Sequence, residues 1–514
     1  MPVKKQPFNI VKDKLVQAVD VDDSRGRSVP INMNYIEEGY LSKDTGCSLN
    51  GATETTLAHS LFVYEKKDGT KYKIRAMGTK LQEESATDVW TDIASSPTFT
   101  AGAEFGYIVY DDELWFGNAV ESLYKWDGTT FTEYPSLPKG NIMEIFEDRL
   151  FISGVTAEPL TTYYSNAGDF TTFTGTDLLK PLGTDHTTGL VNYFGSLLIF
   201  KEQSIWKLTF VYDQVVSLFI PKLESQNRNY GAVSRKAISW VENDIWFFNG
   251  REVRSIGFKD QQIGVLGVNN SVLSEPIKET LAYLLQTNYS QVTTFYFNRR
   301  FYMSLPLSST TNNVTFVCHL LHGNNWTKYT DRIKSSANSY VEDDGVIYTT
   351  KSATPYGTLK WDNALLNDNG AGVPATVAFK AIEDQDFSRF NIYRYLDLMF
   401  KDLKARVTTT IKQDASDTRL SKEKTYLVGL DVEGEENALA EVPVGEMLIA
   451  DSFGETRLTP PFIKRRISFL SKAQSLTIQL SNSNANETFT IAQFALSGHK
   501  QPRKQLASGN IISI

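Results

Sequence analysis

The chain has 514 residues, of which 41% are hydrophobic, 22% charged and 12% aromatic. This length is too great for one compact core, and it predicts about three folding units, or fewer if the protein is all-β. Its formal net charge of −8 disfavours a protein that holds nucleic acid by neutralising phosphates, because such proteins need a strongly basic face. The 24 Tyr and 30 Phe favour β-strands.

The residues that metal and disulfide sites require are scarce. Cys47 and Cys318 lie far apart and show no CxxC spacing, and the whole chain has 5 His. The N-terminal residues are basic without an apolar core, and no run of about 18 uncharged apolar residues occurs. We therefore expect a soluble chain without a secretory signal, membrane segment, metal or cofactor.

Residues 1–57 are predicted to form an extended or strand segment that closes or flanks the domain after it. From 58 to 370 a unit recurs, in which alternating apolar residues lead to a turn rich in Asp, Asn or Gly and then to an aromatic run. Each copy is predicted to be a β-hairpin. The copies are 107–116, 142–152, 190–200, 238–248, 294–303 and 339–348, with a looser one at 61–74.

Several hairpins are followed by a third strand that ends in an aromatic residue. These residues are Trp126, Trp206, Trp326 and Trp361. The units recur every 35 to 55 residues or so, roughly the length of a four-stranded propeller blade. We predict that residues 58–370 form a β-propeller of about seven blades, with six or eight blades, or a series of hairpins in a sandwich, as the alternatives.

Two further regions depart from this rhythm. Ser274, Pro276 and apolar residues three to four apart predict a short helical insertion near 274–286. Beyond 370, longer strands separated by charged loops predict a distinct C-terminal β-sandwich-like domain over 371–514. The predicted fold class is therefore all-β, a propeller followed by a sandwich.

Short segments along most of the chain occur in the order found in a known family. They are Pro30–Met33, Glu38–Leu41, Gly189–Phe200 with Ser204–Trp206, Tyr230–Ser234, Arg300–Pro306 and Phe462–Arg466. Together they resemble the packaged-DNA stabilisation proteins, or tail hubs, of P22-type short-tailed phages, and more loosely the nozzle proteins of T7-like phages.

The resemblance implies a structural virion protein, made in the bacterial host cytoplasm, that forms a hexameric ring in the phage tail. Such a ring would continue the DNA channel and help to retain the packaged genome until ejection. The implied partners are other copies of the chain, the head-to-tail adaptor ring, tail fibre or spike and needle proteins, and double-stranded DNA in transit. The acidic net charge suits a conduit, since it repels phosphate.

Two alternatives stay open at this stage. One is a glycan-binding or glycan-cleaving propeller at a tail tip, because the segment Ser165–Phe173 faintly resembles the Asp-box turn of sialidases. The other is a distal tail or head-completion component of a long-tailed phage. The paired acids of Asp111-Asp112, Glu147-Asp148 and Asp343-Asp344 could act as general acid and base, but they fall at predicted hairpin tips, so we expect turns and no enzyme.

The remaining candidates are charged or metal-binding residue types in short clusters. Lys464, Arg465 and Arg466 are the candidate contact with DNA or a partner protein, and Lys500–Lys504 is a second basic run. The acidic runs 20–23 and 431–436 lack calcium-loop spacing and are expected to face solvent. Cys318, His319 and His322 lie close in sequence, and we expect packed or exposed side chains there.

Overall fold

The computed structural model describes residues 4–9, 29–36, 40–174, 178–215, 218–260, 265–269, 271–379, 382–383, 391–413, 422–429, 463–473 and 475–500. These residues are almost entirely β-strands and connecting turns, and they belong to two compact units. One unit comprises Gly46–Leu320 and Tyr329–Asn363, and the other Met1–Thr45, Leu321–Lys328 and Ala364–Ile514. Each unit is described by itself below.

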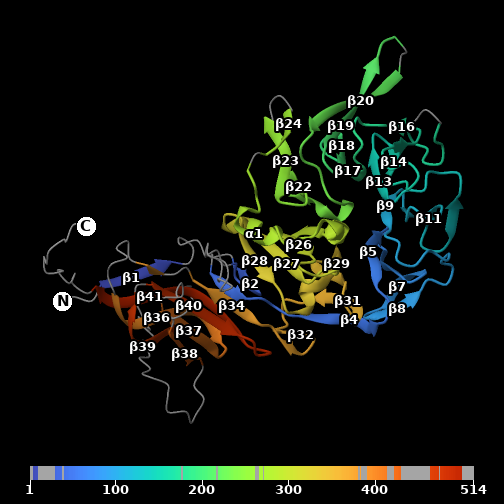
Figure 1. Ribbon diagram of the computed structural model, residues 1–514. Coiled ribbons are helices and arrows are strands. Elements are labelled where there is room, and N and C mark those ends of the chain that lie inside the picture. Colours follow the sequence, from blue (N-terminus) through green and yellow to red (C-terminus); the bar gives the residue numbers. More distant parts are fainter. Residues whose placement is uncertain are drawn as a thin grey trace, which may run out of the picture. The chain divides into compact units, whose positions relative to one another are not determined.

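The first unit is a β-propeller (Figure 1). Its described residues form seven antiparallel sheets, and neighbouring sheets pack against one another from the first to the seventh and back to the first. The first three blades are β5 (Ala58–Glu65), β6 (Lys71–Met77), β7 (Lys80–Ala86) and β8 (Val89–Asp92); β9 (Gly106–Tyr110), β10 (Glu113–Gly117), β11 (Leu123–Trp126) and β12 (Phe131–Tyr134); and β13 (Ile142–Phe146), β14 (Arg149–Ser153), β15 (Thr162–Tyr164) and β16 (Leu178–Leu179).

The remaining blades continue in sequence order and confirm the predicted propeller of about seven blades. The fourth and fifth are β17 (Thr187–Asn192), β18 (Leu197–Lys201), β19 (Ile205–Asp213) and β20 (Leu218–Asn227); and β21 (Ile238–Val241), β22 (Asp244–Phe248), β23 (Val253–Asp260) and β24 (Val265–Val268). The last two are β25 (Thr293–Phe297), β26 (Arg300–Leu305), β27 (Val314–His319) and β28 (Asn325–Tyr329); and β29 (Ala337–Asp343), β30 (Val346–Lys351), β31 (Tyr356–Trp361) and β4 (Cys47–Glu54).

The seventh blade is completed by a strand that precedes the first blade in sequence. β4 pairs antiparallel with β31, and Leu49 lies opposite Leu359. The buried Arg75 of the first blade donates to the Glu54 carboxylate at the end of β4 (2.6 Å) and to Thr358 Oγ1 of β31 (3.1 Å). The N-terminal segment therefore closes the ring of blades.

The paired acidic residues lie in the turns between the first and second strands of the blades, and the backbone geometry of these turns explains why they occur there. Asp111 and Asp112 have φ of 49° and 60°, and Glu147 and Asp148 have φ of 49° and 53°. Two consecutive residues in the left-handed region are typical of the two-residue hairpin turn whose twist matches that of the flanking strands. The short polar side chains thus mark turns that the backbone geometry requires.

Aromatic side chains fill the spaces between and within the blades. Phe62 stacks on Tyr107 of the next blade with ring centroids 4.4 Å apart. The repeated tryptophans Trp126, Trp206 and Trp361 end or lie within the third strands and are buried. Burial of such large side chains is the main favourable contribution to blade packing.

The helical insertion between the fifth and sixth blades is divided into three short helices and extends a few residues beyond the predicted 274–286. It consists of η2 (Glu275–Ile277), α1 (Lys278–Leu281) and η3 (Gln286–Gln291). The side chain of Ser274 does not cap it, because its buried Oγ accepts a hydrogen bond from the Val253 N–H at 2.9 Å. Elsewhere in the described residues there are three further short helices, η1 (Arg235–Ala237), η4 (Leu320–His322) and η5 (Ile333–Ser336).

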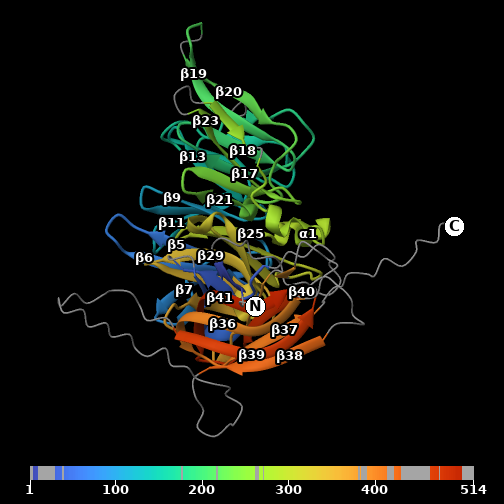
Figure 2. The same ribbon diagram turned by 90° about the vertical axis from the view of Figure 1, so that its left-hand side faces the viewer.

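The second unit is a sandwich of two antiparallel sheets, which confirms the predicted C-terminal fold (Figure 2). One sheet has the order β2 (Met33–Tyr35), β3 (Leu41–Lys43), β41 (Thr488–Lys500), β36 (Asn391–Lys404) and β39 (Ile463–Ala473), with β1 (Lys4–Asn9) also paired to β41. The other has the order β34 (Ala375–Ala378), β40 (Ser475–Asn482), β37 (Val407–Gln413) and β38 (Lys422–Val428), with β35 (Ile382–Glu383) paired to β40. The short strands β32 (Asn367–Asp368) and β33 (Ala371–Gly372) pair with each other.

The inner faces of both sheets form one hydrophobic core. Leu396, Leu398 and Phe400 alternate along β36, and they are fully buried with Ile478 and Leu480 of β40. Met33, Tyr35 and Leu41 of the N-terminal strands belong to the same core. The segment 1–57 therefore divides, since β1, β2 and β3 extend a sandwich sheet while β4 completes the propeller.

Candidate functional site

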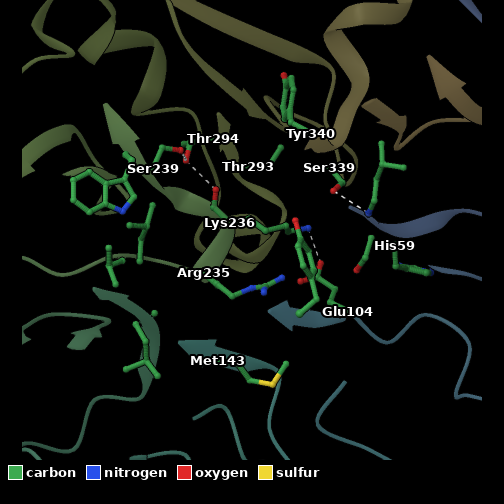
Figure 3. A pocket seen from close by; sticks show the side chains of 18 residues that line it. His59, Glu104, Met143, Arg235, Lys236, Ser239, Thr293, Thr294, Ser339 and Tyr340 are labelled. Carbon is green, nitrogen blue, oxygen red and sulfur yellow. Dashed lines mark hydrogen bonds and ion pairs between the residues drawn. The ribbon is translucent and has the colours of Figure 1, made fainter. Parts of the chain in front are cut away.

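The innermost strands of the seven blades surround a cavity of about 320 Å³ in the propeller (Figure 3). Every blade contributes to its lining. The lining residues include His59, Tyr107, Met143, Leu190, Trp240, Thr294 and Tyr340, one from the first strand of each blade. In a closed propeller the first strands meet at the axis, so this cavity is the central channel.

Two cations of η1 reach toward other blades at this cavity. Figure 3 shows Arg235 and Lys236 pointing toward Glu104. Lys236 Nζ lies 2.6 Å from Glu104 Oε1 and 3.3 Å from Asn338 Oδ1, and Arg235 Nη2 donates to the carbonyl oxygen of Phe105 at 2.8 Å. These contacts connect the fifth blade to the second and the seventh.

The other polar groups of the cavity bond to one another or to the main chain. Ser239 Oγ and Thr294 Oγ1 are 2.8 Å apart, and Thr294 also donates to the Lys236 carbonyl oxygen at 2.9 Å. Burial lowers the pKa of His59, and Lys236 lowers it further although Glu104 opposes the shift. This shift favours the neutral form of His59. The charged groups of the cavity are then Glu104, Arg235 and Lys236, one more cation than anion, and they stand beside hydroxyl groups.

A pair of exposed aromatic rings borders the cavity and was not recognised from the sequence. Trp240, which lines the cavity, is 41% exposed, and Phe194 is 59% exposed with its ring centroid 5.8 Å from that of Trp240. Phe194 occupies a turn position with φ of 41°. A bulky residue in the left-handed region is an outlier. In the sequence, a Phe that precedes Gly195 within a predicted hairpin turn could have indicated this exposed ring.

The paired acids lie in hairpin turns and bind neighbouring blades. Tyr110 Oη donates to Asp148 Oδ1 at 2.6 Å, and the Tyr64 hydroxyl donates to the Asp112 carbonyl oxygen. Lys67 lies 2.6 Å from Asp111 and lowers the pKa of its carboxyl. These contacts join one blade to the next.

The same holds for the third acidic pair. Lys71 Nζ of the first blade lies 2.8 Å from Asp344 Oδ1, and Lys73 Nζ lies 3.2 Å from Asp343 Oδ2 of the seventh blade. Lys71 lowers the pKa of Asp344. Asp343 and Asp344 thus form ion pairs that join the seventh blade to the first, where the ring of blades closes.

The segment that resembles an Asp-box forms a local turn. Asp169 accepts hydrogen bonds from the Thr171 N–H (2.9 Å) and hydroxyl (2.6 Å), and the bonds from Thr171 lower the pKa of Asp169 to about 2. Ser165 is buried, and its Oγ accepts a hydrogen bond from the Leu150 N–H at 2.9 Å. Phe170 packs on Tyr110, with centroids 4.2 Å apart.

The basic triplet in β39 is divided between two faces of its sheet. Arg466 makes two hydrogen bonds to the buried carboxylate of Asp397, at 2.6 and 2.9 Å, and Lys464 Nζ lies 3.3 Å from the same group. Burial would raise the pKa of Asp397, but the two cations outweigh it and lower that pKa. Arg465 occupies the alternate position and therefore faces the other way. Lys464 and Arg466 remain about one-third exposed on the outer face.

The remaining sequence candidates are dispersed. Cys318 and His319 are buried on β27, and burial raises the pKa of the Cys318 thiol. His322 ends η4, with its ring 5.8 Å from Tyr35. In the described part of the chain no group of three or more His, Cys, Asp or Glu side chains is placed to hold a metal ion. The runs 20–23, 431–436 and 501–504 lie outside the described residues.

No protein-family model matches the sequence, and no curated protein is detectably similar to it. The fold resembles the N-terminal domain of Nup159 (TM-score 0.38, 10% identity, 65% of this chain and 96% of the other). It also resembles the computationally designed Ika8 protein (TM-score 0.37, 11% identity, 61% of this chain and 98% of the other). A third similar structure is the Neurospora crassa Pan2 WD40 domain (TM-score 0.34, 10% identity, 63% of this chain and 95% of the other). Similarity at this level has no bearing on activity or partners. Among the described residues, none of the helices has the length and hydropathy needed to cross a bilayer.

Proposed function

We propose that this protein is a structural subunit of the tail of a short-tailed phage. In this proposal six copies form a ring that continues the DNA channel and helps to retain the packaged genome until ejection. The ring contacts the head-to-tail adaptor and the tail fibre, spike or needle proteins. The order of segments that resemble tail hubs and nozzles, from Pro30–Met33 to Phe462–Arg466, motivates the proposal.

The observation that carries the proposal is the small volume of the axial channel of the propeller. The channel has a volume of about 320 Å³, and the Lys236–Glu104 ion pair lies in it. A nucleic-acid duplex does not fit there. In the proposed assembly the DNA therefore passes between copies of the chain, and each propeller acts as a piece of wall. The net charge of −8 per copy limits adhesion of phosphates to that wall.

The engagement of the candidate catalytic acids supports a structural role. Asp111, Asp148, Asp343 and Asp344 are held by lysine or tyrosine side chains of neighbouring blades. Groups arranged in this way strengthen the contacts between blades. We therefore propose that the protein is not an enzyme.

The proposal is tested by the oligomeric state and position of the full-length protein. We expect mass photometry and electron microscopy of the purified chain with portal and adaptor proteins to show sixfold rings. Labelled protein should map to the tail of virions. A monodisperse monomer at micromolar concentration, with no ring on grids containing portal and adaptor, would contradict the proposal.

The basic triplet gives a finer test of the contact with DNA or a partner. Lys464→Gln removes a cation that is one-third exposed without placing a second carboxylate beside Asp397, and it leaves both hydrogen bonds from Arg466 to Asp397. If this face contacts DNA or an acidic partner, the variant should assemble or retain the genome less well than Lys422→Gln on β38. Equal genome retention and assembly in both variants would remove the triplet from the interface.

One observation favours a second function, a glycan-binding propeller. Trp240 lines the cavity together with the hydroxyl-bearing Ser239 and Thr294, and the exposed ring of Phe194 packs against Trp240. Aromatic faces next to hydrogen-bonding groups suit the apolar and polar faces of a sugar ring. Incubation with host surface glycans should then show binding that Trp240→Ala abolishes, and reducing ends would appear if the site cleaves. Neither signal is expected from a tail ring.

A further inference from the structure

The fourth blade ends in a hairpin that extends beyond its own sheet. β19 has 9 residues and β20 has 10, and they pair from Ile205–Asn227 to Asp213–Leu218. The pairing of β19 with β18 stops at Leu208. Beyond that point the two strands form a ribbon, which stands apart from the other blades in Figures 1 and 2.

The outer part of this ribbon exposes large apolar side chains on both faces. Val211 (45% exposed) lies opposite Ile220 (41%), and Tyr212 (51%) lies opposite Phe219 (64%), with the two aromatic centroids 5.4 Å apart. Successive residues of a strand point to opposite faces, so each face carries one of these pairs. Val215, in the turn, is 92% exposed. We call these five residues the ribbon tip.

Apart from Asp213, whose carboxylate accepts a hydrogen bond from the Val215 N–H of the turn at 2.7 Å, the charged side chains of the ribbon lie nearer the body of the blade. Lys222 lies opposite Thr209, and Lys207 lies opposite Glu224. Lys222 Nζ is 2.8 Å from Glu224 Oε1. The ribbon is thus graded from charged rungs at its base to apolar rungs at its tip, a pattern expected for a surface buried only at its far end.

The backbone of the ribbon decides between the possible occupants. β20 is the last strand in the order of its sheet, and in the described residues Thr209–Tyr212 pair with β20 on one side only. Both long edges of the ribbon are therefore open. A lipid interior disfavours open edges, because unpaired peptide groups cost several kcal/mol each there. A strand with the opposite direction satisfies each edge.

A second copy of the chain supplies that strand. The β19 edge of one copy and the β20 edge of the next run antiparallel, as β19 and β20 do within one ribbon. This contact is head-to-tail, and such contacts close into a ring when repeated by rotation. Rotation about one axis keeps equivalent residues of all copies at the same height along that axis. The apolar residue pairs of neighbouring ribbons therefore lie side by side, and so do the charged residue pairs.

We propose that the β19–β20 ribbon is a self-assembly element, whose copies pair edge to edge into a closed β-barrel, so that the side chains of neighbouring ribbon tips pack side by side on each face of the barrel. The inference rests on the ring assembly proposed above and names the surface that forms it. A two-stranded ribbon is at best marginally stable alone in water, and pairing in a barrel removes its open edges.

The test compares full-length Val215→Asp/Phe219→Asp with wild type and with Leu182→Asp. Leu182 is 74% exposed in a loop of the same propeller and serves as the matched control. All these side chains are exposed, so near-ultraviolet circular dichroism should show that each variant folds. We expect mass photometry to show at least a tenfold higher concentration for half-assembly in the tip variant, and no change for Leu182→Asp.

The outcomes separate this inference from the proposed function. Rings of wild type and of the tip variant at the same concentration would overturn the ribbon inference and leave the tail ring standing. A wild-type chain that never forms rings would overturn both. Flotation of wild type, but not of the tip variant, with phosphatidylcholine–phosphatidylglycerol vesicles, together with unchanged assembly of the variant, would replace the second copy by a lipid surface.

Discussion

The propeller and the sandwich use the same antiparallel strands, but they differ in how far apart in sequence their paired strands lie. Six blades are formed by consecutive strands, such as β5 to β8 within Ala58–Asp92. The sandwich pairs Leu41 with Ile491, and Lys43 Nζ donates to Asn482 Oδ1 at 2.6 Å across 439 residues. Local pairing lets each blade form with little loop-closure entropy, whereas the sandwich requires both ends of the chain together.

The propeller has one long-range dependence of its own, the closing strand β4. The N-terminal segment therefore serves both units, with β1 to β3 in one and β4 in the other. This division gives a way to perturb either unit without the other.

The largest expected effect comes from two truncations that end on either side of β4. Removal of residues 1–45 deletes Met33, Tyr35 and Leu41 from the sandwich core but leaves β4 intact. We expect hydrogen exchange, followed by mass spectrometry, to show lost protection in 391–413 and 463–500 only. Removal of residues 1–57 should abolish protection in both units. Equal propeller protection in the two truncations would show that β4 does not close the ring.

Next in size is the ion pair at ring closure. Arg75→Met removes the cation that binds Glu54 and Thr358, and leaves the Glu54 carboxylate partly buried without it. Loss of one partner of a buried pair typically costs about 3–5 kcal/mol. Urea unfolding monitored by the propeller tryptophans should report this loss, and Arg75→Lys should lose less. A change below about 1 kcal/mol would show that closure does not depend on this contact.

A smaller, pH-dependent effect is expected within one blade. Burial raises the pKa of Glu144 on β13 to about 7, against an ordinary value of 4.5. The folded state therefore holds a proton that the unfolded state has lost, and the resulting destabilisation grows from pH 4.5 to about 7 and is then constant. Glu144→Gln should raise the stability by roughly 2–3 kcal/mol at pH 8 but little at pH 4.5. A pH-independent difference would contradict this assignment.

The sandwich has a comparable long-range contact, made by Lys43 of β3. Lys43 is buried and donates to Asn482 Oδ1 (2.6 Å) and to the Asn484 carbonyl oxygen (2.8 Å). Lys43→Met should destabilise the sandwich by about 2 kcal/mol, because hydrogen bonds to a buried charged group are lost. Hydrogen exchange in β40 and β41 checks this, with Lys404→Met, an exposed side chain, as the control. Faster exchange in the propeller alone would contradict it.

The smallest effect concerns a single bond between blades. Tyr110→Phe removes the hydroxyl that donates to Asp148 at an exposed turn. We expect a loss of about 0.5–1 kcal/mol. Tyr193→Phe, which removes a bond from a buried ring to the Asn243 carbonyl oxygen, should cost more. The reverse order in thermal unfolding would show that burial does not set the strength of these contacts.

The sequence by itself determined the hairpins, the number of blades to within one, and the presence of a second β domain. Alternating apolar residues and turn pairs such as Asp111-Asp112 are local patterns, and the backbone twist demands such residues at those positions. The sequence also indicated that the paired acids belong to turns. Which blades these acids would join was not visible, because blade-to-blade contacts depend on the closed ring.

Only the tertiary structure decided which strands the N-terminal strands pair with and which carboxylate Lys464 and Arg466 contact. The alternation of apolar residues in a strand indicates which side chains share a face, but it does not indicate which strand is the partner. The pairing of β4 with β31 could therefore not be predicted from the sequence. In the same way, Arg466 and Asp397 meet because β39 and β36 pair across 69 residues. Which strands pair depends on how much apolar surface each sheet face buries and on the conformational entropy that the chain loses. No local pattern of residues shows the balance of these two free energies.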